Sequence, residues 1–141
     1  MKNLMNCDCA GKWGTFSLTF LRVVLGAIFL AHGWQKYEGG VAGVTGFLGG
    51  LGFPSPEVFA VLLIAGEILA GVLLIVGAWT HWAAKLAGVI ALVALLTVHL
   101  KNGFINPGGY EYILLILAAS IMVMVHGGGK WSVDHKWFHK G

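Results

Sequence analysis

Ionisable side chains fall within long apolar stretches of the sequence, where they are costly unless they have partners or a function. Glu67 lies near the middle of one stretch, and His32 and His99 lie toward the ends of two others. Carboxyl and imidazole groups are the usual proton carriers near neutral pH. We therefore expect Glu67, His32 and His99 to be catalytic residues that transfer protons.

Other polar side chains border the same stretches and are expected to complete a ligand-binding site. A mostly apolar pocket with a few polar groups suits the head group of a hydrophobic ligand such as a quinone. Ordinary interpretations stay open for single members, since Lys36 and Glu111 also fit boundary charges and His32 also fits a core histidine. The candidate ligand-binding residues are Arg22, Gln35, Lys36, Tyr110 and Glu111.

Arg22 is the expected partner of Glu67. The small residues Ala60, Ala70 and Gly71 share the helical face of Glu67, which directs this carboxylate toward neighbouring helices. An Arg22–Glu67 ion pair would satisfy both groups and lock the helices together. The alternative is that Arg22 extends to the membrane surface while Glu67 is protonated and serves a ligand.

The composition places these residues in a membrane protein. Hydrophobic residues make up 57% of the 141 residues and charged residues 11%, which excludes a soluble globular domain and a disordered chain. A membrane-spanning helix needs about 20 mostly apolar residues. We expect four such helices, at about residues 16–37, 57–79, 82–100 and 110–126.

These elements predict an all-α fold class, an integral membrane four-helix bundle that forms one domain over residues 1–141. An even number of spans places both termini on one side of the membrane. Lys36 and Lys101 fall on the other side, and the remaining seven of the nine basic residues fall on the side of the termini. The positive-inside rule therefore predicts cytoplasmic tails at about residues 1–15 and 127–141, in a plasma membrane.

The connection between the first two spans, residues 38–56, is long and rich in glycine. Val41, Val44, Leu48 and Leu51 recur within it at helical spacing. This pattern predicts a short interfacial or re-entrant helix on the outer face, and the alternative is a flexible loop.

A haem-binding subunit is a less favoured interpretation. His32 and His99 fall toward the outer side of the membrane, and His81 and His126 fall toward the inner side. Two histidines on facing helices can ligate a haem. The spacing fixes no such ligand pair, so haem is not expected.

No metal site and no nucleic-acid partner are expected. Cys7 and Cys9 form a C-x-C pair in the N-terminal tail, and two sulfur ligands do not close a metal site. His135 and His139 could add ligands, but nothing in the sequence brings the two tails together. The basic residues are scattered and form no stripe for a nucleic acid.

Several short motifs, taken together in their order and spacing, resemble the DoxX family of small membrane proteins. The resemblance covers nearly all of the chain after about residue 15. The matching segments are RVVLG at residues 22–26, FLAHG at 29–33, AGEILAG at 65–71, VH at 98–99, GYEY at 109–112 and GKWSVD at 129–134.

This resemblance implies a four-helix protein of a bacterial or archaeal plasma membrane. It also implies a redox role, since the wider family includes a subunit of a thiosulfate:quinone oxidoreductase. The cysteine pair and the histidine-rich C-terminal tail depart from the family pattern, so its partners do not transfer directly. The residues at the family's polar positions are Arg22, His32, Lys36, Glu67, His99, Tyr110 and Glu111.

Two hypotheses for the function follow. In the first, the chain is a small subunit of a quinone-linked oxidoreductase, with a quinone in a polar pocket of the outer half and electrons from a partner or a substrate such as thiosulfate. In the second, it is a non-enzymatic membrane anchor for a soluble redox partner. A haem-binding subunit and an oligomeric transporter are less favoured. The expected partners are the lipid bilayer and a protein partner or larger membrane complex, with a homo-oligomer as an alternative.

Overall fold

The computed structural model describes residues 12–138, and this part of the chain is helical with no β-strand. Six α-helices are joined by turns and loops, and α4 continues through a π-helix and a 3-10 helix. The elements are α1 (Lys12–Gly39), α2 (Val41–Gly50), α3 (Pro56–Val76), α4 (Thr80–Ala94), the π-helix (Leu95–His99), the 3-10 helix (Leu100–Asn102), α5 (Glu111–His126) and α6 (Val133–Phe138).

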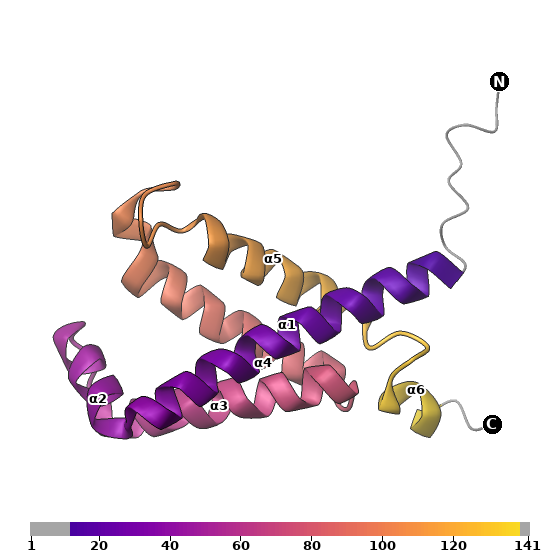
Figure 1. Cartoon of the computed structure of the whole chain (residues 1–141), viewed down its shortest axis with the longest axis horizontal. Coiled ribbons are helices and arrows are strands. Elements are labelled where there is room, and N and C mark those ends of the chain that lie inside the picture. Colours follow the sequence, from indigo (N-terminus) through magenta and orange to yellow (C-terminus); the bar gives the residue numbers. More distant parts are fainter. Residues whose placement is uncertain (1–11, 139–141) are drawn as a thin grey trace.

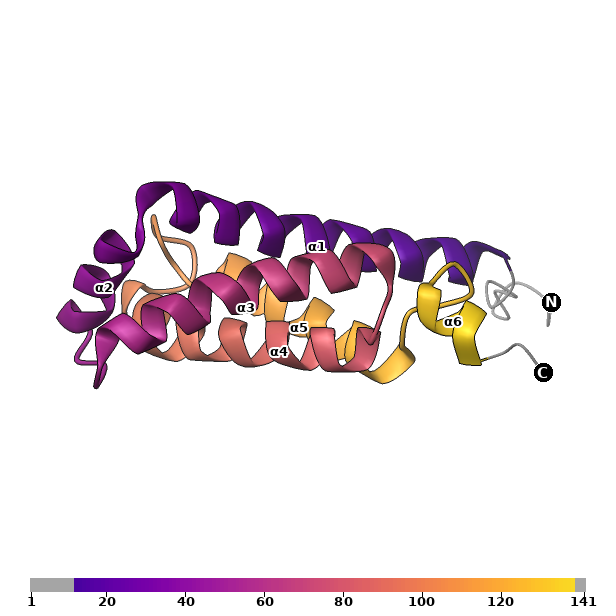
Figure 2. The same ribbon diagram turned by 90° about the horizontal axis from the view of Figure 1, so that it is seen from below.

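The long helices pack in the order α1, α3, α4 and α5. Helix α2 and the loop before α5 lie at one end of the bundle, which we call the α2 end (Figure 2). The turn between α3 and α4 lies at the opposite end, beside α6, and we call this the α6 end. In Figure 1, α1 and α5 lie close together toward the α6 end and diverge toward the α2 end.

Three helical segments are long and apolar enough to cross a membrane: Trp13–Gly39, Pro56–Val76, and Thr80–Asn102, which joins α4 to the two helices after it. These segments confirm three of the four expected spans, and the chain is a membrane protein of the helical-bundle class. Helix α5 is apolar but has only 16 residues. The fourth span and the orientation of the termini therefore stay predictions.

Glycines bring α1 and α3 together at backbone distance. A Cβ added to Gly71 of α3 would lie 2.5 Å from the backbone nitrogen of Leu30 in α1, and one added to Gly26 would lie 2.8 Å from the carbonyl oxygen of Gly71. Ala60 and Ala70 on the same face of α3 are fully buried. The small-residue face predicted around Glu67 is thus the α1–α3 contact and the nearby core.

The glycine-rich connection contains an ordered helix. Helix α2 buries Val44 and Leu48 against Ala60 and Ile64 of α3. The helix expected from the spacing of these residues is therefore confirmed, and the flexible-loop alternative is wrong. Its interfacial position in the membrane stays a prediction.

The α1–α3 contact predicts opposite effects of two glycine-to-alanine changes. Gly71→Ala should lower the free energy of unfolding by about 1–3 kcal/mol, because the new Cβ meets backbone that cannot move aside. Gly46→Ala in α2 has nothing within 4 Å of the new Cβ, and it should be neutral or stabilise by up to about 1 kcal/mol. Denaturation in detergent followed by circular dichroism measures both. Equal stabilities would contradict the proposed constraint.

Candidate functional site

A half-buried ion pair joins the two longest helices near the α2 end. Lys36 Nζ on α1 donates to both carboxylate oxygens of Glu67 on α3, at 2.8 and 2.7 Å. The Glu67 side chain is 8% exposed and that of Lys36 is 29% exposed. A Cβ on Gly33 would lie 3.0 Å from Glu67 Cβ, so this glycine lets α1 come close enough for the pair to form.

The expected Arg22–Glu67 pair is wrong. Because α1 and α3 are antiparallel, Arg22 lies opposite the last turn of α3, where its buried guanidinium donates to the carbonyls of Leu74 and Ile75. Carbonyls in the last turn of a helix lack intrahelical partners, and the helix dipole favours a cation there. The partner of Glu67 is Lys36 because that residue lies at the level of Glu67 on the adjacent helix.

A cavity of about 180 Å³ lies beside the ion pair. Its walls come from α1, α3, α4, the π-helix and α5. Most of its lining is aliphatic, including Ile28 of α1 and Ile113 of α5, and these two helices diverge toward the α2 end (Figure 1). The polar residues that line it are His32, Lys36, Glu67, His99 and Tyr112.

Both histidines of the cavity are held through the same ring nitrogen. The Nδ1–H of His32 donates to the carbonyl of Ile28 at 2.8 Å, and the Nδ1–H of His99 donates to the carbonyl of Gly108 at 2.8 Å. A carbonyl oxygen only accepts, so Nδ1 of each ring carries a proton. His99 ends the π-helix, and such local widenings of a helix are frequent at functional sites.

Asn102 supports His99 from the loop side and was not anticipated. Its Nδ2 donates to the carbonyl of Gly108 at 2.9 Å, so this carbonyl accepts from both residues. Asn106 in turn donates to the carbonyl of Asn102 at 3.0 Å. The two asparagines before Pro107 were a signal for an ordered turn, which sequence reasoning did not use.

The structure brings together only part of the predicted site. His32, Lys36, Glu67 and His99 line one cavity, joined by Tyr112, which was not among the candidate ligand-binding residues. The remaining candidates lie elsewhere. Gln35 is exposed, Tyr110 packs its ring against Phe104 at 5.2 Å, and Glu111 is exposed in the first turn of α5, while Arg22 belongs to the α6 end.

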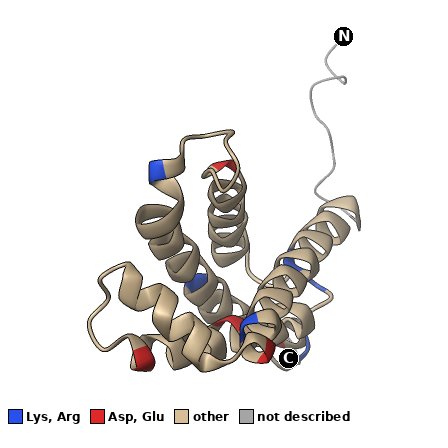
Figure 3. Cartoon of the chain, turned by 60° about the vertical axis from the view of Figure 1, so that its left-hand side comes forward, with Lys and Arg blue, Asp and Glu red and all other residues tan. Residues whose placement is uncertain are grey.

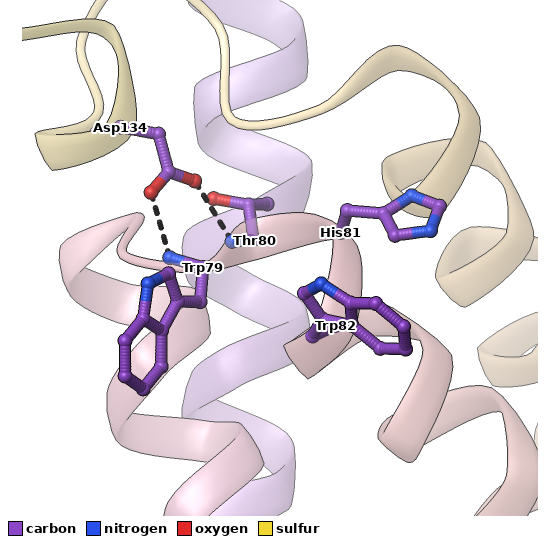
Figure 4. A pocket seen from close by; sticks show the side chains of 5 residues that line it. All are labelled: Trp79, Thr80, His81, Trp82 and Asp134. Atoms are coloured by element: carbon purple, nitrogen blue, oxygen red, sulfur yellow. Dashed lines mark hydrogen bonds between the residues drawn. The ribbon is translucent and has the colours of Figure 1, made fainter. Parts of the chain in front are cut away.

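A second polar cluster closes the α6 end (Figure 4). The Asp134 carboxylate accepts from the backbone N–H groups of Trp79 and Thr80, at 2.7 and 2.8 Å, which caps the N-terminus of α4. The backbone N–H of Asp134 donates to the carbonyl of Gly77 at 3.0 Å. Arg22 donates to the carbonyl of Trp131 at 3.1 Å. These contacts give the GKWSVD motif a structural role that the sequence did not reveal.

The same end carries an open hollow of about 460 Å³, lined by Trp79, Thr80, His81, Trp82 and Asp134. His81 Nδ1–H donates to the carbonyl of Met124 at 3.0 Å, and His126 Nδ1–H donates to that of Met122 at 3.0 Å. Charged residues are otherwise sparse along the helices (Figure 3). Among residues 12–138, no group of three or more histidine, cysteine or acidic residues is placed to hold a metal ion. Cys7, Cys9 and His139 lie outside the described residues.

The fold and the site thus define a helical membrane bundle with a half-buried ion pair beside a small, mostly apolar cavity. The family model described as DoxX matches residues 17–100, which is more than half of the chain. The chain belongs to the DoxX family.

The chain is also similar to proteins of three bacteria. The chain is 35% identical to the "Putative oxidoreductase CatD" of Bacillus subtilis, over 68% of this chain and 69% of that protein. It is 32% identical to an uncharacterized protein of Haemophilus influenzae, over 92% and 96% of the two chains. It is 28% identical to an uncharacterized membrane protein of Mycobacterium tuberculosis, over 87% and 82%. No solved structure matched the chain.

The cap on α4 predicts a loss of stability when Asp134 is truncated. Asp134→Ala should lower the free energy of unfolding by about 1–2 kcal/mol, because two backbone N–H groups lose their acceptor. Lys136→Ala, on an exposed residue of α6, is the matched control and should change it little. Unfolding in detergent measures the difference, and equal values for the two variants would contradict the capping role.

The ion pair predicts non-additive effects of its two neutralising changes. Lys36→Met and Glu67→Gln should each destabilise the bundle by about 3 kcal/mol, because each leaves one charge without its partner in an apolar environment. The double variant should recover much of that loss, since no unpaired charge remains. Glu57→Gln, at an exposed site in the first turn of α3, is the control. Additive losses in the double variant would show that the pair is not coupled.

Proposed function

We propose that this chain is a small membrane subunit of a redox system and binds a quinone or a similar apolar ligand in the cavity between α1, α3, α4 and α5. The observation that carries the proposal is the lining of that cavity. Two imidazoles, a carboxylate, an ammonium and a phenol meet there within an aliphatic frame. The name of the Bacillus subtilis relative, "Putative oxidoreductase CatD", supports the redox role.

The size and surroundings of the cavity fit a head group with an apolar tail. A volume of about 180 Å³ is below that of a typical pocket for a whole small molecule, about 300–1,000 Å³, and it suits a single ring. The tail would leave between α1 and α5, past Ile28 and Ile113, which line the cavity. A haem is larger than this space and is not part of the proposal.

Each polar residue would have a role in proton-coupled reduction of the ring. Lys36 and Tyr112 would donate to ring oxygens, and His32, His99 and Glu67 would supply or accept the protons that accompany the electrons. The electrons would come from a protein partner in a larger membrane complex, or from a small substrate such as thiosulfate, as the family resemblance implies.

We also propose that α5 is the fourth span, with both termini cytoplasmic in the plasma membrane of a bacterium or archaeon. Sixteen residues of α-helix measure about 24 Å, somewhat less than the bilayer core of about 30 Å. The start of α1 and helix α6 lie at the same end of the bundle (Figure 2), as an even number of spans requires. The cavity, toward the α2 end, then lies in the outer half.

A second candidate function is a non-enzymatic anchor for a soluble redox partner. Trp131 and Trp137 at the α6 end are 62% and 67% exposed, and aromatic side chains are common anchors of protein interfaces. In this case the Lys36–Glu67 pair would be purely structural, and the chain would bind no quinone.

Blocking the cavity tests the first function. A short-chain quinone should bind saturably to the chain in lipid nanodiscs, and Ala94→Phe should weaken binding at least tenfold, because Ala94 lines the cavity and the ring would fill it. Ala118→Phe, at an exposed position on α5, is the matched control and should bind as the unaltered chain does. Thermal stabilisation by the quinone measures binding. Absence of saturable binding to the unaltered chain would rule out the quinone proposal and favour the anchor.

A further inference from the structure

The two histidines of the cavity present the same kind of atom to a ligand. The Nδ1–H groups of His32 and His99 are both committed to backbone carbonyls, at 2.8 Å each. No described residue bonds to the Nε2 atom of either ring, and both rings line the cavity. In the neutral imidazole, a proton on Nδ1 makes Nε2 a hydrogen-bond acceptor. The cavity therefore offers a ligand two acceptors whose tautomer the backbone has set.

The remaining polar groups of the cavity do not supply more hydrogen-bond donors than acceptors. Glu67 adds two carboxylate oxygens, which only accept hydrogen bonds. Both already accept a hydrogen bond from Lys36. Lys36 keeps one N–H beyond those two bonds, and the hydroxyl of Tyr112 can donate or accept. The cavity thus has more acceptors than donors.

From this balance we infer that the cavity selects the reduced, hydroquinone form of its ligand over the quinone form. A hydroquinone has two hydroxyl donors for the two Nε2 atoms, whereas a quinone has only carbonyl acceptors. A bound quinone would leave His32 and His99 facing it without donors, and such mismatched polar groups weaken binding. This inference rests on the proposed function and adds the redox state that the site recognises.

The selectivity has a thermodynamic consequence for the bound couple. A site that binds the reduced form more tightly raises the reduction potential of the bound quinone. For a two-electron couple, a tenfold preference corresponds to about 30 mV. The bound quinone would then accept electrons more readily than the same molecule in the lipid, which fits a site where the quinone is the electron acceptor.

The test compares three ligands that share one ring and one short alkyl tail. These are the hydroquinone, its quinone, and its dimethyl ether, which keeps the ring but has no hydroxyl donor. Each is titrated without oxygen into the full chain in nanodiscs. We expect the hydroquinone to bind at least tenfold more tightly than either of the others. Equal or tighter binding of the quinone would overturn the inference but leave the proposed function standing, whereas no binding of any ligand would overturn both.

Asparagine variants assign the selectivity to the two rings. His32→Asn and His99→Asn can keep the N–H that donates to the carbonyl, but both lose Nε2. Each should weaken hydroquinone binding about tenfold and so reduce or abolish the preference for the hydroquinone over the quinone. His126→Asn is the matched control, because His126 makes the same bond four residues back along its own helix, at 3.0 Å, and does not line the cavity. If the double variant His32→Asn/His99→Asn still prefers the hydroquinone over the quinone, the inference is overturned. If these variants fail to fold, the comparison of the three ligands on the unaltered chain still tests the inference.

Discussion

The backbone contact between α1 and α3 fixes where the polar groups of this bundle can meet. Gly26 and Gly33 on α1, and Gly71 on α3, allow two antiparallel helices to approach without intervening side chains. At that separation Lys36 reaches Glu67 and Arg22 reaches the last turn of α3. With a wider spacing, neither cation would contact its acceptors, and each would remain in an apolar environment without compensation.

The two ends of the bundle use their polar groups differently. At the α6 end, Arg22 and Asp134 are matched to backbone carbonyls and N–H groups that helix termini leave unpaired, so their hydrogen bonds complete the fold. At the α2 end, Lys36 and Glu67 bond to each other, whereas the Nε2 atoms of His32 and His99 bond to no described residue.

The sequence was sufficient for features that depend on local pattern. Apolar length predicted four spans, three of which the structure confirms. Helical spacing of apolar residues predicted α2, and small residues predicted the buried face that holds Glu67. The sequence prediction missed the partner of Glu67, because the partner depends on the register between α1 and α3 along their axes. Glycine contacts set this register, and hydrophobic periodicity does not reveal it. The position of His99 depends on the π-helix, which has an extra residue in its turn. The role of Asp134 depends on the turn between α3 and α4, more than fifty residues earlier in the chain.

The contacts at the α6 end also impose an order on assembly. A ribosome releases the chain from its N-terminus, so α1 and α3 can pair well before the C-terminal segment exists. Trp79 and Asp134 are 55 residues apart, and Arg22 and Trp131 are 109 apart. The N-terminus of α4 therefore lacks the Asp134 cap for as long as α5 is being synthesised. The nascent bundle gains these contacts only when α6 emerges, so the described bundle is complete only after this short helix has been made.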